Sequence, residues 1–335
     1  MTPSCCAFPA AKTLARVVDV ASLVGQAREG SPRAVARLIS LVEDASPALR
    51  EVMSALAPFT GSTYIVGLTG SPGVGKSTMT SAIVKALRYK SLRVGVLAVD
   101  PSSPFSGGAL LGDRIRMQDH TLDPEVYIRS MASRGHLGGL SWSTPQALRV
   151  LDAAGCDVVL VETVGVGQSE VEVAGLADTT IVLLAPGMGD GIQAAKAGIL
   201  EVGDVFVVNK ADREGADATA RELRQMISLG EARAPGDWRP PVVQTVASRG
   251  EGLDEVMAAL DEHREWLGGS GALRAGRVRR AAAEIEAITV NILRSRIEVP
   301  RKGTALDDVA GQVVDGTIDP YSAADVLVEA VTAPR

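Results

Sequence analysis

The segment from Gly70 to Thr78 has the residue types and the spacing to hold the phosphates of a nucleotide. It reads Gly70-Ser71-Pro72-Gly73-Val74-Gly75-Lys76-Ser77-Thr78 and matches the pattern G-x-x-x-x-G-K-[ST]. The glycines let backbone N–H groups turn towards phosphate oxygens, and a helix predicted over residues 77–87 adds the positive end of its dipole. We expect Lys76 to reach the β- and γ-phosphates and the Ser77 hydroxyl to bind Mg²⁺. A glycine-rich turn with only a structural role would leave these two residues unexplained.

Three carboxylates follow apolar runs in a way that suits a magnesium site. Glu162 comes directly after the run 158–161, Asp100 comes directly after the run 94–99, and Asp113 follows the turn-rich loop that begins at Pro101. Ligand groups of parallel sheets lie just beyond the carboxyl ends of strands, and Mg²⁺ binds oxygen ligands while keeping several waters. A cap of a neighbouring helix is the alternative role for each carboxylate. The predicted metal ligands are Ser77, Asp100, Asp113 and Glu162.

The segment Asn209-Lys210-Ala211-Asp212 follows the apolar run 205–208 and has the sequence of a guanine-selecting loop. An Asp carboxylate accepts two hydrogen bonds from guanine, one from N1–H and one from the exocyclic amine. Adenine lacks that amine and would leave the carboxylate poorly paired. Asn209 can tie the loop together, and the stem of Lys210 can lie on the base face. The motif therefore predicts GTP rather than ATP.

The segment 246–252 is a candidate for the loop that contacts the guanine carbonyl, because it follows the last predicted strand. It contributes Ala247, Ser248 and Arg249 to the predicted nucleotide site. From these residues alone, an ordinary turn between a strand and a helix fits nearly as well. Its position in the chain favours binding.

Seven apolar runs alternate with amphipathic stretches through the middle of the chain. Continuous runs of Val, Ile and Leu are typical of strands buried on both faces, and hence of a mainly parallel sheet covered by helices. The predicted fold class is α/β: a P-loop NTPase with a mainly parallel central sheet flanked by helices, and with helical extensions at both ends. The runs are 64–69, 94–99, 126–128, 158–161, 180–184, 205–208 and 242–246.

Apolar residues at helical spacing predict two or three helices before the sheet, from about Thr13 to Ala57. Ser31 is the expected N-cap of one of them, with Pro32 at its first helical position. These patterns divide the chain into three parts. The parts are an N-terminal helical segment (1–60), a P-loop GTPase domain (61–267) and a C-terminal helical arm (268–335).

The C-terminal arm is a candidate dimerisation element because its helices lie outside the predicted sheet. A closing helix is expected over 253–266, followed by a break at the glycine-rich segment 268–271. A long helix over 272–297 and a final helix after Pro320 are expected next. We therefore predict a homodimer.

Composition narrows the range of partners and compartments. The 335 residues carry a net charge of −6 with a pI of about 5.3, which gives no electrostatic reason to expect nucleic acid as a partner. Three cysteines make no disulfide framework, and the three histidines lack zinc-ligand spacing. No apolar run approaches the ~18 residues of a membrane span, and the first dozen residues lack the pattern of a secretory signal. We expect a cytoplasmic protein whose partners are small molecules or proteins.

Taken together, the motifs resemble the MeaB/ArgK/MMAA family of GTPases. This family belongs to the wider class that contains signal-recognition-particle and nickel-chaperone GTPases. The resemblance covers roughly residues 38–331 and implies a protein that binds GTP or GDP with Mg²⁺. The segments that carry it are 69–78, 98–103, 107–117, 134–141, 162–169 and 186–198.

Members of this family are described as G-protein chaperones of adenosylcobalamin-dependent mutases, especially methylmalonyl-CoA mutase. The resemblance implies that GTP binding and hydrolysis gate cobalamin loading and protect the mutase during turnover. It also implies a third switch in the loop 187–196, where Gln193 and Lys196 report the nucleotide state; without the resemblance, these residues read as the start of a surface helix. The catalytic residues carried over by motif are Lys76, Asp113 and Glu162.

Hydrolysis is expected to be slow until a partner raises it. No Gln directly follows the glycine after Thr163, and Gln168 lies further along, so the sequence assigns no residue to orient the attacking water. Two alternatives remain open from the sequence. One is a P-loop ATPase linked to amino-acid transport, and the other is a scaffold that nucleotide stabilises without any need for hydrolysis.

Overall fold

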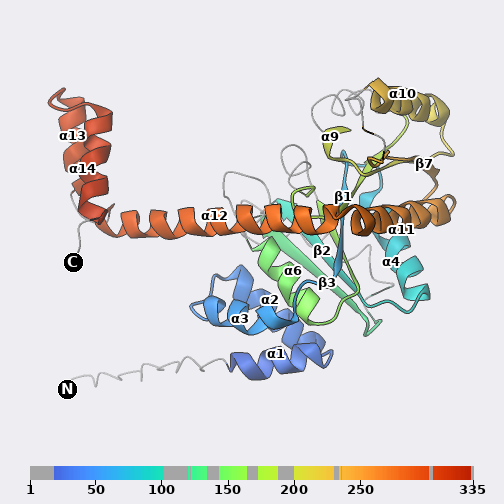
Figure 1. Cartoon of the computed structure of the whole chain (residues 1–335), viewed down its shortest axis with the longest axis horizontal. Helices are drawn as coiled ribbons and strands as arrows, with labels where there is room; N and C mark the ends of the chain where they lie inside the picture. The colour runs from blue at the N-terminus through green and yellow to red at the C-terminus, as the bar shows by residue number, and fades with distance from the viewer. Residues whose placement is uncertain are drawn as a thin grey trace, which may run out of the picture. The chain divides into compact units, whose positions relative to one another are not determined.

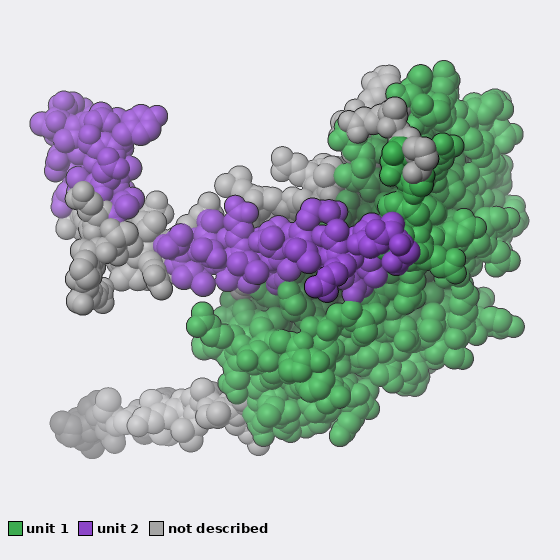
Figure 2. Space-filling view, in the orientation of Figure 1, with its two compact units in different colours: residues 1–267 green, residues 268–335 purple. Residues whose placement is uncertain are grey.

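The computed structural model (Figure 1) describes residues 19–101, 120, 122–133, 143–163, 173–187, 200–229, 234, 236–301 and 305–332. The chain divides into two compact units, Met1–Leu267 and Gly268–Arg335, which Figure 2 colours separately. Asp113, Gln193 and Lys196 lie outside the described residues, and of Asp100 only the backbone is described.

A seven-stranded sheet forms the centre of the first unit, in the order β3-β2-β4-β1-β5-β6-β7. Every pairing between these strands is parallel, which confirms the predicted fold class. β4 and β5 are buried at every position because helices cover both faces, as their unbroken apolar runs predict. The strands are β1 (Tyr64–Thr69), β2 (Val94–Pro101), β3 (Val126–Ser133), β4 (Val158–Thr163), β5 (Thr179–Leu184), β6 (Val205–Asn209) and β7 (Val242–Thr245).

The ends of β4 and β7 differ from the prediction at places that matter for the site, and so does the end of β2, which includes Asp100. Glu162 lies inside β4 rather than beyond it, because its backbone pairs in register with Leu68 of β1 and Ala98 of β2. Val246 does not extend β7; it forms an antiparallel bridge to Glu251 that closes a short loop. Both residues are therefore held by backbone pairing.

Helices α4 (Lys76–Tyr89), α6 (Thr144–Ala153), α10 (Ala216–Leu229) and α11 (Leu253–Ser270) connect or follow the strands, and a short helix α9 (Leu200–Val202) precedes β6. α4 begins directly at Lys76, one residue before the predicted start, because Gly75 acts as its N-cap. α10 packs its apolar side on β6 and β7 around the buried ring of Phe206. The helix between these two strands is thus fixed on the sheet.

Between residue 19 and the sheet, where the chain is described, three helices are present, in agreement with the predicted two or three: α1 (Val20–Arg28), α2 (Pro32–Glu43) and α3 (Leu49–Leu56), with a 3-10 turn η1 (Ala57–Phe59) after them. The Ser31 side chain accepts a hydrogen bond from the Ala34 amide at 3.4 Å, and Pro32 occupies the first helical position, which confirms the expected start of α2. These helices share one buried core with α6, β2 and β4.

The predicted break at residues 268–271 is wrong in its extent, because α11 continues to Ser270. Gly268 and Gly269 lie within this helix, and only Gly271 has a positive φ, at +76°. The second unit contains α12 (Ala272–Arg301), α13 (Ala305–Val314) and α14 (Pro320–Thr332). α12 is longer than predicted, and α13 was not predicted. Among the described residues, no helix is long and apolar enough to cross a bilayer.

Candidate nucleotide site

The glycine-rich turn joins β1 to α4, and its glycines 70, 73 and 75 all have positive φ. At two of these positions a side chain would also collide with a neighbouring strand. Gly70 has φ +138°, and a Cβ there would lie 2.2 Å from the Leu183 carbonyl oxygen. Gly75 has φ +99°, and a Cβ there would lie 2.4 Å from Asn209 Nδ2. Any side chain at either position would push the turn away from β5 or β6, so both positions require glycine.

Lys76 is buried at the start of α4, and its ammonium lies inside the turn. Lys76 Nζ donates to the Gly70 carbonyl oxygen at 2.5 Å and to the Ser71 carbonyl oxygen at 3.3 Å. The turn therefore folds around a positive charge, next to the amino end of α4. Both features favour the binding of an anion such as phosphate.

Glu162 of β4 and Ser77 of α4 meet in a buried contact. The Ser77 hydroxyl donates to Glu162 Oε1 at 2.6 Å, and the Thr80 hydroxyl donates to Glu162 Oε2 at 2.8 Å. Glu162 is 1% exposed. Thr80 is not among the predicted site residues, although its place one turn after Ser77 on the same helix is a signal that points to it.

These residues fit a magnesium ion in the chemistry of their donor atoms. Ser77 and Glu162 present a hydroxyl and a carboxylate oxygen side by side, and hard oxygen ligands of this kind suit Mg²⁺. The backbone of Asp100 lies near the carboxyl end of β2, in register with Ala132 of β3. The structure thus brings together two of the four predicted metal ligands; the side chains of Asp100 and Asp113 are outside its description.

Asn209 is buried at the end of β6 and joins three segments. Its Nδ2 donates to the Val74 carbonyl oxygen at 2.8 Å, and its Oδ1 accepts from the Thr245 hydroxyl at 3.2 Å and from the Ala247 amide at 3.1 Å. Lys210 adds a second link, because its Nζ donates to the Gly73 carbonyl oxygen at 2.6 Å. The predicted base loop and the phosphate turn are therefore one connected assembly.

Asp212 and Arg249 form an ion pair on this assembly, with 3.5 Å between Asp212 Oδ2 and Arg249 Nη2. Both side chains are partly exposed. Ala247, Ser248 and Arg249 belong to the loop that the Val246–Glu251 bridge closes. All the residues predicted to select the base thus lie at or just after the carboxyl ends of β6 and β7, at the same side of the sheet.

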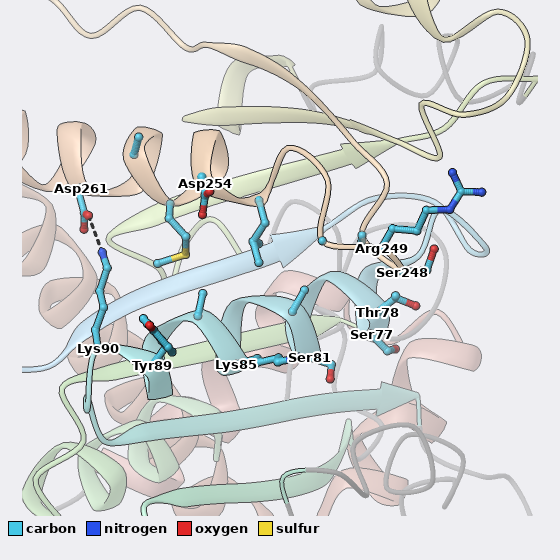
Figure 3. Close-up of a pocket in the computed structure, with 17 residues that line it drawn as sticks. Ser77, Thr78, Ser81, Lys85, Tyr89, Lys90, Ser248, Arg249, Asp254 and Asp261 are labelled. Carbon is cyan, nitrogen blue, oxygen red and sulfur yellow. Dashed lines mark hydrogen bonds and ion pairs between the residues drawn. The ribbon is translucent and has the colours of Figure 1, made fainter.

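A cavity of about 1000 Å³ runs from these residues between α4 and α11. Ser77 and Thr78 line one end together with Ser248 and Arg249, and the opposite end is closed by an ion pair of 2.8 Å between Lys90 and Asp261 (Figure 3). Residues that follow the phosphate turn and residues of the loop 246–252 thus lie side by side at one end of this cavity.

A second polar cluster lies at the amino ends of the strands, away from this edge. His263 of α11 bonds the Thr179 hydroxyl at 2.7 Å, and its Nε2 lies 3.5 Å from Asp204 Oδ1. Its ring stacks on Trp266 with 5.6 Å between the ring centroids. Burial lowers the pKa of His263 to about 4 and raises the pKa of Asp204 to about 6. This cluster fastens α11 to the sheet.

Comparison with known proteins decides the family. The family model described as methylmalonyl-CoA mutase-associated GTPase MeaB matches residues 35–301. The chain belongs to the MeaB family. This confirms the resemblance found in the motifs and makes the chain a member of a family of P-loop GTPases, so guanine-nucleotide binding is the family's property.

Individual relatives agree with this MeaB assignment. The protein named GTPase ArgK of Escherichia coli is 39% identical over 261 residues, covering 76% of this chain and 79% of that protein. The mouse protein named methylmalonic aciduria type A homolog, mitochondrial, is 37% identical over 271 residues, covering 80% of this chain and 65% of that protein. A crystal structure of a protein named LAO/AO transport system kinase superposes with a TM-score of 0.70 at 28% identity, covering 95% of this chain and 99% of that one.

Proposed function

We propose that this MeaB-family protein binds GTP with Mg²⁺ and hydrolyses it to GDP and phosphate. The observation that carries the proposal is that Asn209 of the guanine motif hydrogen-bonds both the phosphate turn, at Val74, and the loop 246–252, at Ala247. A nucleotide that spans the two would contact one preformed assembly. Such preorganisation lowers the entropic cost of binding.

The residues divide the work of binding and hydrolysis. Lys76, held within 3.3 Å of two turn carbonyls, would exchange them for phosphate oxygens. Ser77 and Glu162 would hold Mg²⁺, whose charge offsets that of the β- and γ-phosphates. Asp212 would pair with the guanine edge. Glu162 and Asp113 are the proposed residues for water activation, with Asp100 completing the metal ligands.

Competition between GDP and ADP tests the base assignment. We expect GDP to displace a fluorescent guanine nucleotide at far lower concentration than ADP, because Asp212 pairs only with a base that carries two adjacent donors. Equal displacement by ADP would refute guanine selection. It would favour the alternative of an ATPase linked to amino-acid transport; the name of the similar protein, LAO/AO transport system kinase, contains the word transport.

We further propose that the GTP cycle gates cobalamin loading of an adenosylcobalamin-dependent mutase and protects that mutase, with methylmalonyl-CoA mutase as the first candidate. Support comes from the description of the family model, which names methylmalonyl-CoA mutase, and from the name of the mouse relative. Gln193 and Lys196 are the proposed residues that report the nucleotide state to the mutase. A cytoplasmic location is part of the same proposal.

Recovery of the mutase on immobilised protein tests the partner. We expect retention from native extract in the presence of a non-hydrolysable GTP analogue, and its loss when Lys76 is replaced by Ala. If the mutase is retained equally with and without nucleotide, and equally by the Lys76→Ala variant, the alternative of a scaffold that does not need hydrolysis is favoured. Single-turnover hydrolysis that is fast without any partner would contradict the expected stimulation.

A homodimer through the C-terminal arm is the proposed assembly. α12 exposes Val278, Ile285 and Ile292 at seven-residue spacing, with Ile288 between the last two. Apolar residues at this spacing are typical of a helix that packs along another helix. Light scattering tests the proposal: replacement of Ile285 and Ile292 by Ser should give a monomer, and an unchanged mass would refute it.

A further inference from the structure

Arg249 lies against the carboxylate that is proposed to select guanine. Its guanidinium sits between two acidic side chains, with Nη2 3.5 Å from Asp212 Oδ2 and Nη1 3.7 Å from Glu251 Oε1. The Arg249 side chain is 59% exposed, and Figure 3 shows it extending away from the cavity between α4 and α11. Guanine and Arg249 therefore need the same carboxylate.

The backbone that carries Arg249 is fixed, whereas the side chain is solvated and long. The Arg249 amide donates to the Val246 carbonyl oxygen at 2.8 Å, and the Ala247 amide donates to Asn209 Oδ1. Gly252 follows with φ +73°, and a Cβ there would lie 2.2 Å from the Gln244 carbonyl oxygen. A rigid turn thus presents a movable guanidinium within reach of Asp212.

We propose that Arg249 is a reversible competitor of guanine for Asp212, and that it weakens the affinity for guanine nucleotides. The inference rests on the proposed function, since it concerns the same base site. Guanine needs both oxygens of the carboxylate for its two donors, and Arg249 lies against Oδ2. When guanine displaces the Arg249 guanidinium from Asp212, the guanidinium can still pair with the Glu251 carboxylate.

The size of the effect follows from the exposure of the pair. Exposed ion pairs are weak, so the paired state holds only a modest majority of the molecules. Because apparent affinity scales with the fraction of molecules in the competent state, removal of Arg249 should tighten GDP binding about two- to five-fold. Added salt screens the pair, so the difference should shrink between about 0.05 M and 0.5 M salt.

GDP titration of Arg249→Ala against the wild-type chain tests the inference. The matched control is Arg213→Ala, which removes the same charge from the end of the base loop and leaves the Asp212–Arg249 pair intact. We expect tighter binding only for Arg249→Ala. Binding that is unchanged or weaker in this variant would overturn the inference. A wild-type chain that does not bind GDP at all would instead refute the proposed function.

A double-mutant cycle shows whether the effect passes through Asp212. Asp212→Asn removes the negative charge, and its amide can donate to the carbonyl that xanthine carries in place of the exocyclic amine of guanine. In the Asp212→Asn background, we expect Arg249→Ala to change the affinity for xanthosine diphosphate by less than about 1.5-fold. A two- to five-fold change there would show that Arg249 acts through another group and would overturn the inference.

Discussion

Replacement of Asn209 by Ala measures how strongly the base loop is tied to the phosphate turn. The side chain is 3% exposed and makes three hydrogen bonds, to the Val74 carbonyl oxygen, the Thr245 hydroxyl and the Ala247 amide. Each bond contributes about 0.5–1.5 kcal/mol net, and the substitution leaves the three partners buried without Asn209. We expect the free energy of unfolding to fall by about 2–4 kcal/mol.

The increase in stability that GDP produces distinguishes a variant that is only less stable from one that also binds GDP more weakly. With GDP at 100 times the wild-type Kd, the wild-type chain should gain about 2.7 kcal/mol. A variant whose Kd is ten times weaker should gain only about 1.4 kcal/mol at the same GDP concentration. Urea unfolding with and without GDP measures both quantities.

The control for this experiment is Gln225→Ala, which removes an exposed amide side chain from α10 in the same unit. It should stay within about 0.5 kcal/mol of the wild-type chain, as substitutions outside packed networks usually do. An Asn209→Ala variant that matches this control, and that gains the full 2.7 kcal/mol from GDP, would refute the claim that Asn209 joins the two loops.

Three further predictions concern the same unit. Glu162→Gln removes the negative charge and keeps the size of the side chain, and the hydroxyl that faces the new amide can turn to accept a hydrogen bond from it. GTP hydrolysis should therefore fall about 100-fold while the urea midpoint stays close to that of the wild-type chain; an unchanged single-turnover rate would count against Glu162. Gly75→Ala places a Cβ 2.4 Å from Asn209 Nδ2 at φ +99° and should cost about 1–3 kcal/mol of stability. Gly73→Ala has a similar positive φ of +80° but open space for the Cβ, so it should cost less; equal losses in urea unfolding would contradict this reasoning. Acidification from about pH 6.5 to 4 should destabilise the fold through His263, because its folded-state pKa of about 4 means that the unfolded chain binds the proton first. The same acidification should stabilise the fold through Asp204, because its folded-state pKa of about 6 means that the folded chain binds the proton first. Asp204→Asn should therefore lose stability more steeply than the wild-type chain across this range, and parallel curves of unfolding free energy against pH would refute the assignment.

The sequence by itself determined where the strands and the two motifs begin, because both depend on local chemistry, although β3 continues to Ser133 beyond the predicted run 126–128. The run from Tyr64 to Thr69 is a strand with the predicted bounds, since an unbroken apolar run suits a position buried on both faces. The phosphate turn is equally local, because its glycines and Lys76 act within eight residues. Local residue type did not decide the end of α11. Glycines 268 and 269 favour a break, but the helix continues through both of them.

The tertiary structure alone decided which distant residues meet. Parallel pairing sets β4 beside β1 and brings Glu162 to Ser77 and Thr80, more than eighty positions away in the chain. The same sheet order sets β6 beside β5 and β7, so that Asn209 reaches Val74 and Ala247. The residue types at each strand end were enough to predict candidate site residues. Which of these residues contact one another across the sheet depends on strand order and register. Those are properties of the packed chain as a whole, which local patterns do not encode.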